Sequence, residues 1–260
     1  MTPQLPKERP APDRTPFQVN GPARVGVLPD VHVPCHDNPA LTVAIEKLRR
    51  DKITHLLLNG DTMDCAGVAS WDKDPTKQDL RQELECGKQF LTYLRHVFPK
   101  IPIFFKHGNH EDRMERYLWR KAPELAGLPT LRLREILQFD RFGITEVPTH
   151  TKIKLGKLVV IHGHEHRFSI SNPVNPARGI YLRMGVGTMV SHFHQFSTHS
   201  HRNGDDKLIT TWSTGCLRQL SPDYAPINNW SHGFATVEVA KDGAYDVANY
   251  RILHGKCWTS

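Results

Sequence analysis

Apolar runs that end in polar residues recur along this chain. The clearest lies in residues 101–111, IPIFFKHGNHE, where an apolar run from Ile101 to Phe105 opens into a glycine turn. Continuous apolar runs of about four to eight residues are typical of strands that are buried on both faces. Four further runs end in the same way, and each delivers Asp, Asn or His. Open α/β sheets gather their chemistry at the carboxyl ends of strands, so the pattern predicts one site there.

The first half of the chain alternates such strands with helices. Residues 24–28 and 53–58 are predicted strands, and residues 40–50 between them have helical spacing, with Asn38 as the expected cap. Residues 78–98 predict a long helix before the third strand. Strand–helix–strand units of this kind build a parallel sheet through right-handed crossovers.

Two more helices are predicted after the third strand, over residues 113–121 and 131–139. Arg113 and Arg116 are interpreted as part of a solvated helix face, and contact with a substrate is the alternative. The second half of the chain then changes to short strands. Residues 144–147, 152–155 and 157–161 predict a β-meander, residues 163–179 a loop, residues 187–194 a strand end, and residues 234–239 and 245–250 a closing hairpin. Three aromatic residues are interpreted as packing residues: Trp212, Tyr224 and Trp230.

Length and composition fit a globular protein that contains 38% hydrophobic residues. Residues 1–22 hold six prolines among polar residues and predict a loose tail or strap, while residues 23–260 form one domain. The N-terminus does not resemble a signal peptide, and no apolar run approaches the ~18 residues of a membrane helix. Five cysteines without a CxxC pair suit a reducing compartment, so a cytoplasmic location is expected. The net charge of +7 favours an anionic partner.

The strand-end residues together form a metal-type ligand set. Two carboxylates, one amide and four imidazoles can supply two first-row ions, which typically lie ~3.5–4 Å apart in such sites. Mixed nitrogen and oxygen ligands suit manganese, the ion expected here, or iron, zinc or nickel, better than magnesium or calcium. The residues are Asp30, His32, Asp61, Asn109, His162, His192 and His194.

In order and spacing, these motifs resemble those of the calcineurin-like metallophosphoesterase superfamily. They cover residues 25 to about 195, and the resemblance implies an α/β fold, a two-sheet αββα sandwich. The motifs read Asp30-Val31-His32, Gly60-Asp61-Thr62-Met63-Asp64, Gly108-Asn109-His110-Glu111, His162 and His192-Phe193-His194.

The resemblance also implies roles for these residues. One metal would be held by Asp30, His32, Asp61 and His194, and the second by Asp61, Asn109, His162 and His192. Asp61 would bridge the two ions, and a hydroxide between them would attack phosphorus in line. His110 would serve as general acid or charge stabiliser at the leaving oxygen. Asp64 matches the carboxylate that orients this histidine in the protein-phosphatase branch.

The sequence departs from the family pattern at three places. Ser191 replaces the glycine that usually precedes the last motif. Residues 163–166, GHEH, offer His164 and His166 as alternative final ligands, in which case the lone histidine would come from upstream, for example His150. We adopt His162 with His192 and His194, because the gap between residues 162 and 192 matches that of the family. Cys65 stands where serine/threonine phosphatases carry arginine, which weakens a protein-phosphatase assignment.

The sequence thus predicts a metal-dependent phosphoric ester hydrolase. The substrate expected is a phosphorylated small molecule or a nucleic acid, either a monoester or a diester such as a cyclic nucleotide or DNA. The alternative is a catalytically silent metal-binding or nucleic-acid-binding protein on the same fold. All seven ligand positions and His110 carry chemically competent residues, which favours the enzyme.

Overall fold

The computed structural model describes residues 5, 7–72, 74, 76, 79–166 and 174–259. Its first half contains β1 (Phe17–Val19), β2 (Ala23–Leu28), α1 (Asn38–Arg50), β3 (His55–Asn59), η1 (Ala66–Val68), α2 (Leu80–Val97), β4 (Ile103–Lys106), α3 (Asp112–Lys121), η3 (Pro123–Leu125), η4 (Pro129–Leu131), α4 (Leu133–Ile136) and α5 (Phe139–Phe142). Its second half contains β5 (Ile144–Val147), β6 (Ile153–Leu155), β7 (Leu158–Val160), α6 (Pro176–Met184), β8 (Thr188–Val190), β9 (Phe196–Arg202), β10 (Leu208–Thr214), β11 (Gly233–Val239), β12 (Tyr245–Leu253) and β13 (Lys256–Thr259).

A seven-stranded sheet carries the parallel strands predicted from the first half of the chain. Its strand order is β13-β12-β11-β2-β3-β4-β5, with β2 to β5 parallel and the remaining pairs antiparallel. Leu57 pairs with Val27 on one side and with Phe104 on the other. The two crossover helices of the prediction are present as α1 and α2. The predicted parallel βαβαβ start is therefore confirmed.

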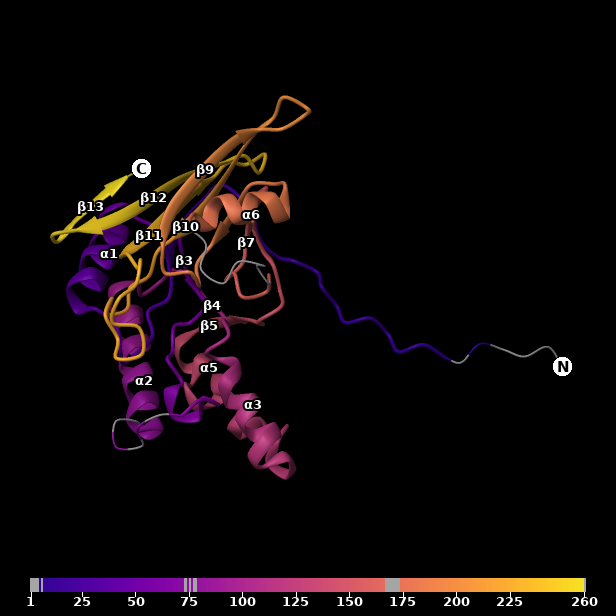
Figure 1. The fold of residues 1–260 in the computed structure, drawn as a ribbon, viewed down its shortest axis with the longest axis vertical. Coiled ribbons are helices and arrows are strands. Elements are labelled where there is room, and N and C mark those ends of the chain that lie inside the picture. The colour runs from indigo at the N-terminus through magenta and orange to yellow at the C-terminus, as the bar shows by residue number, and fades with distance from the viewer. Residues whose placement is uncertain are drawn as a thin grey trace.

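The second sheet has six strands in the order β1-β6-β7-β8-β10-β9. The predicted β-meander is wrong for residues 144–147, because β5 pairs in parallel with β4 of the other sheet, while β6 and β7 form an antiparallel hairpin. Part of the expected N-terminal tail also joins this sheet, since β1 pairs in parallel with β6. The described residues before β1 extend away from the body (Figure 1).

The two sheets stack face to face with helices outside them. Buried residues of the seven-stranded sheet alternate between two cores, as strand geometry requires. Leu57 faces the other sheet, whereas Leu56 and Leu58 face the layer of α1 and α2. A smaller cluster that includes Ile180 lies under α6 on the outer face of the six-stranded sheet. This helix–sheet–sheet–helix order is the αββα sandwich that the resemblance implied.

The helices differ from prediction in their details. Asp37, and not Asn38, caps α1, because its side chain accepts the backbone N–H of Ala40 at 2.8 Å. Two short helices, α4 and α5, replace the one predicted over residues 131–139. Of the loop predicted over residues 163–179, residues 167–173 lie outside the described residues, and α6 already begins at Pro176.

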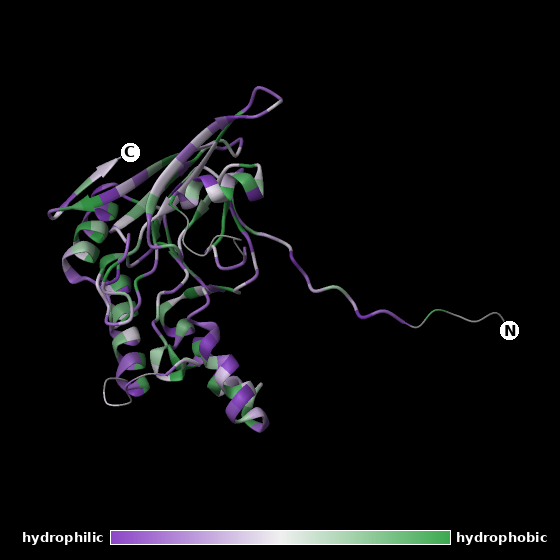
Figure 2. Ribbon diagram, viewed as in Figure 1, coloured by the Kyte–Doolittle hydropathy of each residue, from purple (hydrophilic) through white to green (hydrophobic). Residues whose placement is uncertain are grey.

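Helix α3 projects from the body and is mainly hydrophilic (Figure 2). Among the described residues, no helix combines the length and the apolar character needed to span a bilayer.

Candidate metal centre

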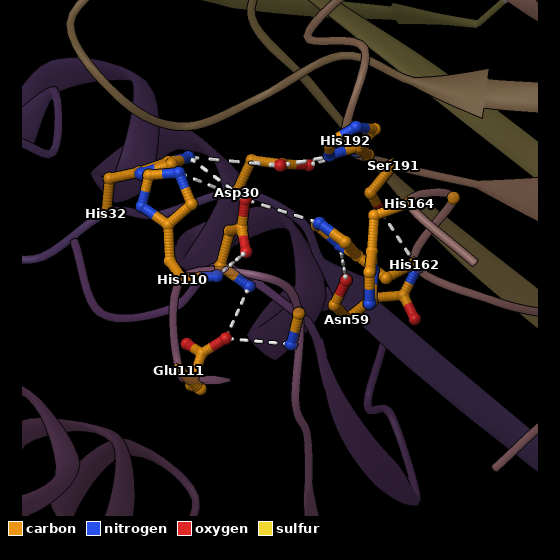
Figure 3. A network of polar contacts seen from close by, with 12 residues as sticks. Asp30, His32, Asn59, His110, Glu111, His162, His164, Ser191 and His192 are labelled. Carbon is orange, nitrogen blue, oxygen red and sulfur yellow. Dashed lines mark hydrogen bonds and ion pairs between the residues drawn. The ribbon is translucent and has the colours of Figure 1, made fainter. Parts of the chain in front are cut away.

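The predicted ligand residues lie on loops that follow strands of both sheets. Asp30 follows β2, Asp61 follows β3 and Asn109 follows β4 in the seven-stranded sheet. His162 follows β7 and His192 follows β8 in the six-stranded sheet. The carboxyl ends of parallel neighbours meet at one edge of a sheet, so these loops converge. Figure 3 shows Asp30, His162 and His192 facing a common region.

Three groups of buried or half-buried side chains are compact enough to hold a cation. Within each group, the potential ligand atoms all lie within 4.8 Å of one another. The groups share His32 and Asp61, so they adjoin one another and form a single centre. They are Asp30 with His32 and His194, His32 with Asp61 and His110, and Asp61 with His162 and His192.

The first group is organised around Asp30. Its Oδ1 lies 3.2 Å from His194 Nε2, and the Nε2 atoms of His32 and His194 are also 3.2 Å apart. Asp30 Oδ2 accepts the backbone N–H of His192 at 2.9 Å, which ties the last ligand loop to the first. A carboxylate oxygen and two imidazole nitrogens can all offer lone pairs to one cation.

The third group, Asp61 with His162 and His192, is organised around Asp61. Its Oδ2 lies 3.3 Å from His162 Nε2 and 3.9 Å from His32 Nε2, so the same carboxylate also approaches the first group through His32. The rings of His162 and His192 have centroids 5.1 Å apart. Asn109 Oδ1 is buried and has no hydrogen-bond partner within the described part of the chain. An amide oxygen of this kind suits a divalent cation.

Contacts outside the ligand set decide which ring nitrogen faces the centre. His162 Nδ1 lies 2.9 Å from the carbonyl oxygen of Asn59, so Nδ1 donates and Nε2 is the ring nitrogen that faces Asp61. His32 Nδ1 lies 2.9 Å from Asp64 Oδ1, with the same consequence. Such partners set the tautomer of metal-binding histidines. Because imidazole nitrogens and carboxylate oxygens lie close together in this buried region, the residues fit divalent ions.

Five of the seven predicted ligands have a left-handed backbone. Non-glycine residues rarely adopt a positive φ, although Asp, Asn and His do so more readily than others. Each such residue costs on the order of 1 kcal/mol or more and persists only where the surroundings enforce it. Strained backbone of this kind clusters at functional sites. The residues are Asp30 (φ 44°), His32 (53°), Asp61 (49°), His192 (61°) and His194 (57°).

Two glycines permit the close approach of the loops. A Cβ at Gly60, whose φ is +85°, would lie 2.3 Å from His162 Nδ1. A Cβ at Gly108 would lie 2.2 Å from Asp61 Oδ1. Any larger residue at either position would push a ligand out of the centre, which explains the glycines of the GD and GNHE motifs.

Charges in the centre move the pKa values of its histidines in opposite directions. Burial opposes protonation of His162, but the Asp61 carboxylate outweighs it and raises the pKa of His162 to about 10. Burial and the neighbouring His162 lower the pKa of His192 to about 3. Burial also opposes ionisation of Asp61, yet His110 and His162 hold its pKa well below the usual range. Asp61 is therefore a carboxylate at neutral pH and attracts positive charge.

Glu111 joins the loops after β3 and β4. Its buried carboxylate accepts three backbone N–H groups, from Asp61 at 3.0 Å, Met63 at 2.9 Å and Gly108 at 2.8 Å. Figure 3 shows it beside the centre and outside the ligand set. The glutamate of GNHE therefore positions Asp61 through hydrogen bonds to the backbone.

Lys106 and Glu165 hold the loop after β7. Lys106 is fully buried at the end of β4, and its Nζ lies 3.0 Å from Glu165 Oε1. Glu165 in turn accepts the backbone N–H groups of His162 at 3.3 Å and Gly163 at 2.6 Å. Sequence reasoning missed this ion pair. Its one signal was a lysine that directly continues an apolar strand.

His110 belongs to the compact group with His32 and Asp61, and Asp64 lies beside that group. His110 Nδ1 is 2.8 Å from the backbone carbonyl oxygen of Asp64 and 3.2 Å from its Oδ1. His110 Nε2 lies 3.6 Å from Asp61 Oδ2. The Asp64 carboxylate thus contacts both His32 and His110, and these two histidines hold the pKa of Asp64 far below its usual range, although burial opposes this.

Arg113 does not lie on a solvated helix face, and that interpretation was wrong. It is only 9% exposed, because it lies in the first turn of α3 and reaches back to the loop after β3. Its Nη1 donates to the carbonyl oxygen of Asp64 at 2.6 Å, and its Nη2 contacts His110 Nε2. Arg116 is exposed, as expected.

The alternative histidines take a different position. Among the described residues, the compact groups include His192 and His194 and neither His164 nor His166. The His164 ring lies 5.2 Å from that of His162, at the side of the group formed by Asp61, His162 and His192. Burial together with His162 lowers the pKa of His164 to about 4. Ser191, the departure from the family pattern, accepts a hydrogen bond from Asn59 Nδ2 at 2.8 Å.

Fold and centre together define an αββα protein with a candidate dinuclear metal site. The chain belongs to the calcineurin-like phosphoesterase family, whose model matches residues 23–210. The resemblance inferred from the motifs is therefore confirmed.

Similar proteins come from a phage and from two eukaryotes. The gene 54 protein of Mycobacterium phage D29 is 26% identical over 231 residues, which cover 83% of this chain and 89% of that protein. A dimetal phosphatase from Danio rerio has a TM-score of 0.41 at 10% identity, covering 85% of this chain and 93% of that structure. Vps29 of Chaetomium thermophilum has a TM-score of 0.41 at 14% identity, covering 89% of this chain and 92% of that structure.

Proposed function

We propose that this protein hydrolyses phosphate esters with a pair of divalent metal ions. The observation that carries the proposal is the set of three adjoining Asp and His groups, two of which share Asp61. A carboxylate within reach of two neighbouring ligand groups is suited to bridging two cations. One ion is assigned to Asp30, His32, Asp61 and His194, and the other to Asp61, Asn109, His162 and His192.

Bound divalent ions lower the pKa of water and neutralise charge on a phosphoryl group. The mixed nitrogen and oxygen ligands favour manganese, with iron, zinc or nickel as alternatives. The protein supplies fixed tautomers at His32 and His162, through Asp64 and the Asn59 carbonyl. These contacts keep the ring nitrogens directed at the centre before any ion binds.

His110 is assigned the proton transfer to the leaving oxygen, or the stabilisation of charge there. The backbone N–H of His110 donates to Asp61 Oδ1 at 3.0 Å, which holds the residue against the centre. Its ring nitrogen Nδ1 donates to the Asp64 carbonyl oxygen, so Nε2 is the nitrogen on the side of Asp61, where Arg113 Nη2 contacts it. Asp64 is assigned the orientation of this ring.

The substrate is proposed to be a nucleotide or nucleic acid, since a net charge of +7 attracts polyanions. A cytoplasmic location is proposed as well, supported by five free cysteines, which persist in a reducing compartment.

The direct test is an assay of manganese-loaded protein on a chromogenic phosphomonoester, a chromogenic phosphodiester and linear DNA, with His110→Ala alongside. We expect hydrolysis by the wild type and a loss of turnover of about 10²-fold or more in the variant. Its metal content should stay unchanged, because His110 is assigned to neither ion. If no substrate in the panel is hydrolysed, the protein is catalytically silent. Full turnover by His110→Ala would remove the assigned acid.

A further inference from the structure

A pocket adjoins the metal centre on the side of His110. Its volume is about 550 Å³, within the range of small-molecule sites. His110 and Asp64 form its inner end, and two arginines and two aromatic residues lie along its walls: Arg113, Arg218, Trp71 and Tyr224. Nothing in the assigned ligand set accounts for these four side chains.

Arg218 is the most unusual of them. It is 2% exposed, yet its Nε has no hydrogen-bond partner among the residues that the structure describes. Its Nη1 donates to the hydroxyl of Tyr224 at 2.7 Å and lies 3.7 Å from Asp64 Oδ1. A buried guanidinium with an unused donor is costly unless a partner completes it. An anion in the pocket would be such a partner.

Arg113 also lines the pocket, and both arginines pack on aromatic rings. The Arg113 guanidinium carbon is 4.3 Å from the ring centroid of Trp71, and that of Arg218 is 5.3 Å from the ring of Tyr224. Trp71 is 52% exposed and Tyr224 66% exposed. Tyr224 packs against Trp230 and Arg218, as interpreted, but most of its surface stays exposed. These open rings can stack on a planar ligand group.

The charges of the pocket favour an anion. Asp64 is the buried carboxylate at its inner end, and that group is already shared between His32 and His110. Asp223 also lines the pocket, but it is exposed at the rim, where water screens its charge. The two largely buried guanidinium groups, of Arg113 and Arg218, are thus accompanied by one buried carboxylate, Asp64, which already contacts two histidines. Paired guanidinium forks match the geometry of a phosphate.

We propose that this pocket binds the leaving part of a phosphodiester substrate and that this part is a nucleotide. The arginines would bind its phosphate, and Trp71 and Tyr224 would stack on its base. This inference rests on the proposed function, because His110 marks the leaving side of the centre. Hydrolysis by water would break the P–O bond to the nucleotide, and the departing oxygen would take up a proton beside the pocket.

The test compares two dinucleotides that differ only in terminal charge. In pTpTp the leaving part carries a phosphate whichever ester oxygen departs, whereas in TpT it is neutral. Cleavage of the internal ester is followed by product analysis, and the ratio of kcat/KM for pTpTp to that for TpT is the measured quantity. Binding of thymidine 3′,5′-bisphosphate, measured by calorimetry, is the second readout.

We expect the wild-type ratio to exceed one and Arg218→Met to lower it about tenfold, with a similar weakening of bisphosphate binding. Arg120→Met removes the same charge from an exposed position on α3 and should leave the kcat/KM ratio and bisphosphate binding unchanged. If Arg218→Met does not fold, Trp71→Ala tests the same pocket from an exposed position and should lower both about fivefold or more.

The outcomes separate the two proposals. Hydrolysis of bis(p-nitrophenyl) phosphate with equal ratios in wild type, Arg218→Met and Trp71→Ala would overturn the pocket and leave the phosphoesterase standing. Hydrolysis of the phosphomonoester without hydrolysis of any diester would overturn the pocket proposal alone, and failure to hydrolyse any ester would overturn the proposed function itself. A neutral leaving group preferred over a charged one would also contradict the pocket assignment.

Discussion

Buried acidic residues around the centre differ in their ionisation. Asp61 and Asp64 are kept ionised by neighbouring histidines. Glu83, on α2, accepts the backbone N–H groups of Cys65 and Ala66, and Arg113 lowers its pKa only slightly. Burial, with Asp64 adding to it, raises the pKa of Glu83 to about 7. Glu83 therefore fixes the loop after Asp64 but resists ionisation.

The raised pKa of Glu83 should make the free energy of unfolding depend on pH. The folded protein keeps the Glu83 proton up to about pH 7, whereas an unfolded glutamate loses it near pH 4.5. The folded state thus binds more protons in this window, so the Glu83 contribution to the free energy of unfolding falls as pH rises. Glu83→Gln should remove about 2–3 kcal/mol of this fall between pH 5 and pH 8 in urea titrations.

The matched control for Glu83 is Glu85→Gln on the same helix, whose side chain is largely exposed. This change should leave the pH dependence as in the wild type. If Glu83→Gln showed the wild-type difference between pH 5 and pH 8, the group would not hold a proton in the folded protein.

Some residues of the site carry no sequence signal. The ligands could be predicted, because each follows an apolar run and belongs to a spaced motif. Arg218 lies after the last strand of the six-stranded sheet, in a stretch without periodicity, and only folding brings it beside Asp64. Arg113 was misassigned because a charged helix residue looks solvated in sequence, whereas the start of α3 lies against the loop after β3.

Among the elements, the parallel half was predictable, whereas only part of the second sheet was, namely β6, β7 and β8. Strands β2, β3 and β4 are buried on both faces and read as continuous apolar runs. Strand β9, FSTHSHR, lies at a sheet edge, is largely polar and left no strand pattern. Strand β5 was predicted to pair with the strands that follow it in sequence. Its observed pairing with β4 depends on a crossover connection, which hydrophobic periodicity cannot predict.

The ion pair of Lys106 and Glu165 joins the end of β4 in one sheet to the loop after β7 in the other. It should help to fix the position of one sheet relative to the other. Removing one partner leaves a buried charge, so Lys106→Met or Glu165→Gln should lower the free energy of unfolding by about 3–5 kcal/mol. The double variant should lose clearly less than the sum of the two, because no unpaired charge remains.

Denaturant unfolding of all four proteins measures this coupling. The comparison pair is Lys88 and Glu85 on α2, which is more exposed and should show much weaker coupling. Strict additivity of Lys106→Met and Glu165→Gln would show that the contact adds nothing to stability.

At the scale of the whole molecule, two sheets bring their strand-end loops to one centre. The seven-stranded sheet supplies Asp30, Asp61 and Asn109, and the six-stranded sheet supplies His162 and His192. Neither sheet alone holds a full ligand set for either ion. The hydrophobic layer between the sheets therefore also sets the geometry of the centre. The sequence indicated which residues converge, and their distances depend on how the sheets stack.

Metal stoichiometry shows whether Asp61 bridges two metal ions. Wild-type protein and Asp61→Asn are loaded with manganese, dialysed and analysed for metal per chain, with circular dichroism as a check on folding. We predict two ions per wild-type chain and weakened binding of both in the variant, because each ion loses the same carboxylate. Two ions held at full affinity by Asp61→Asn would contradict the account, as would a wild-type chain that binds none.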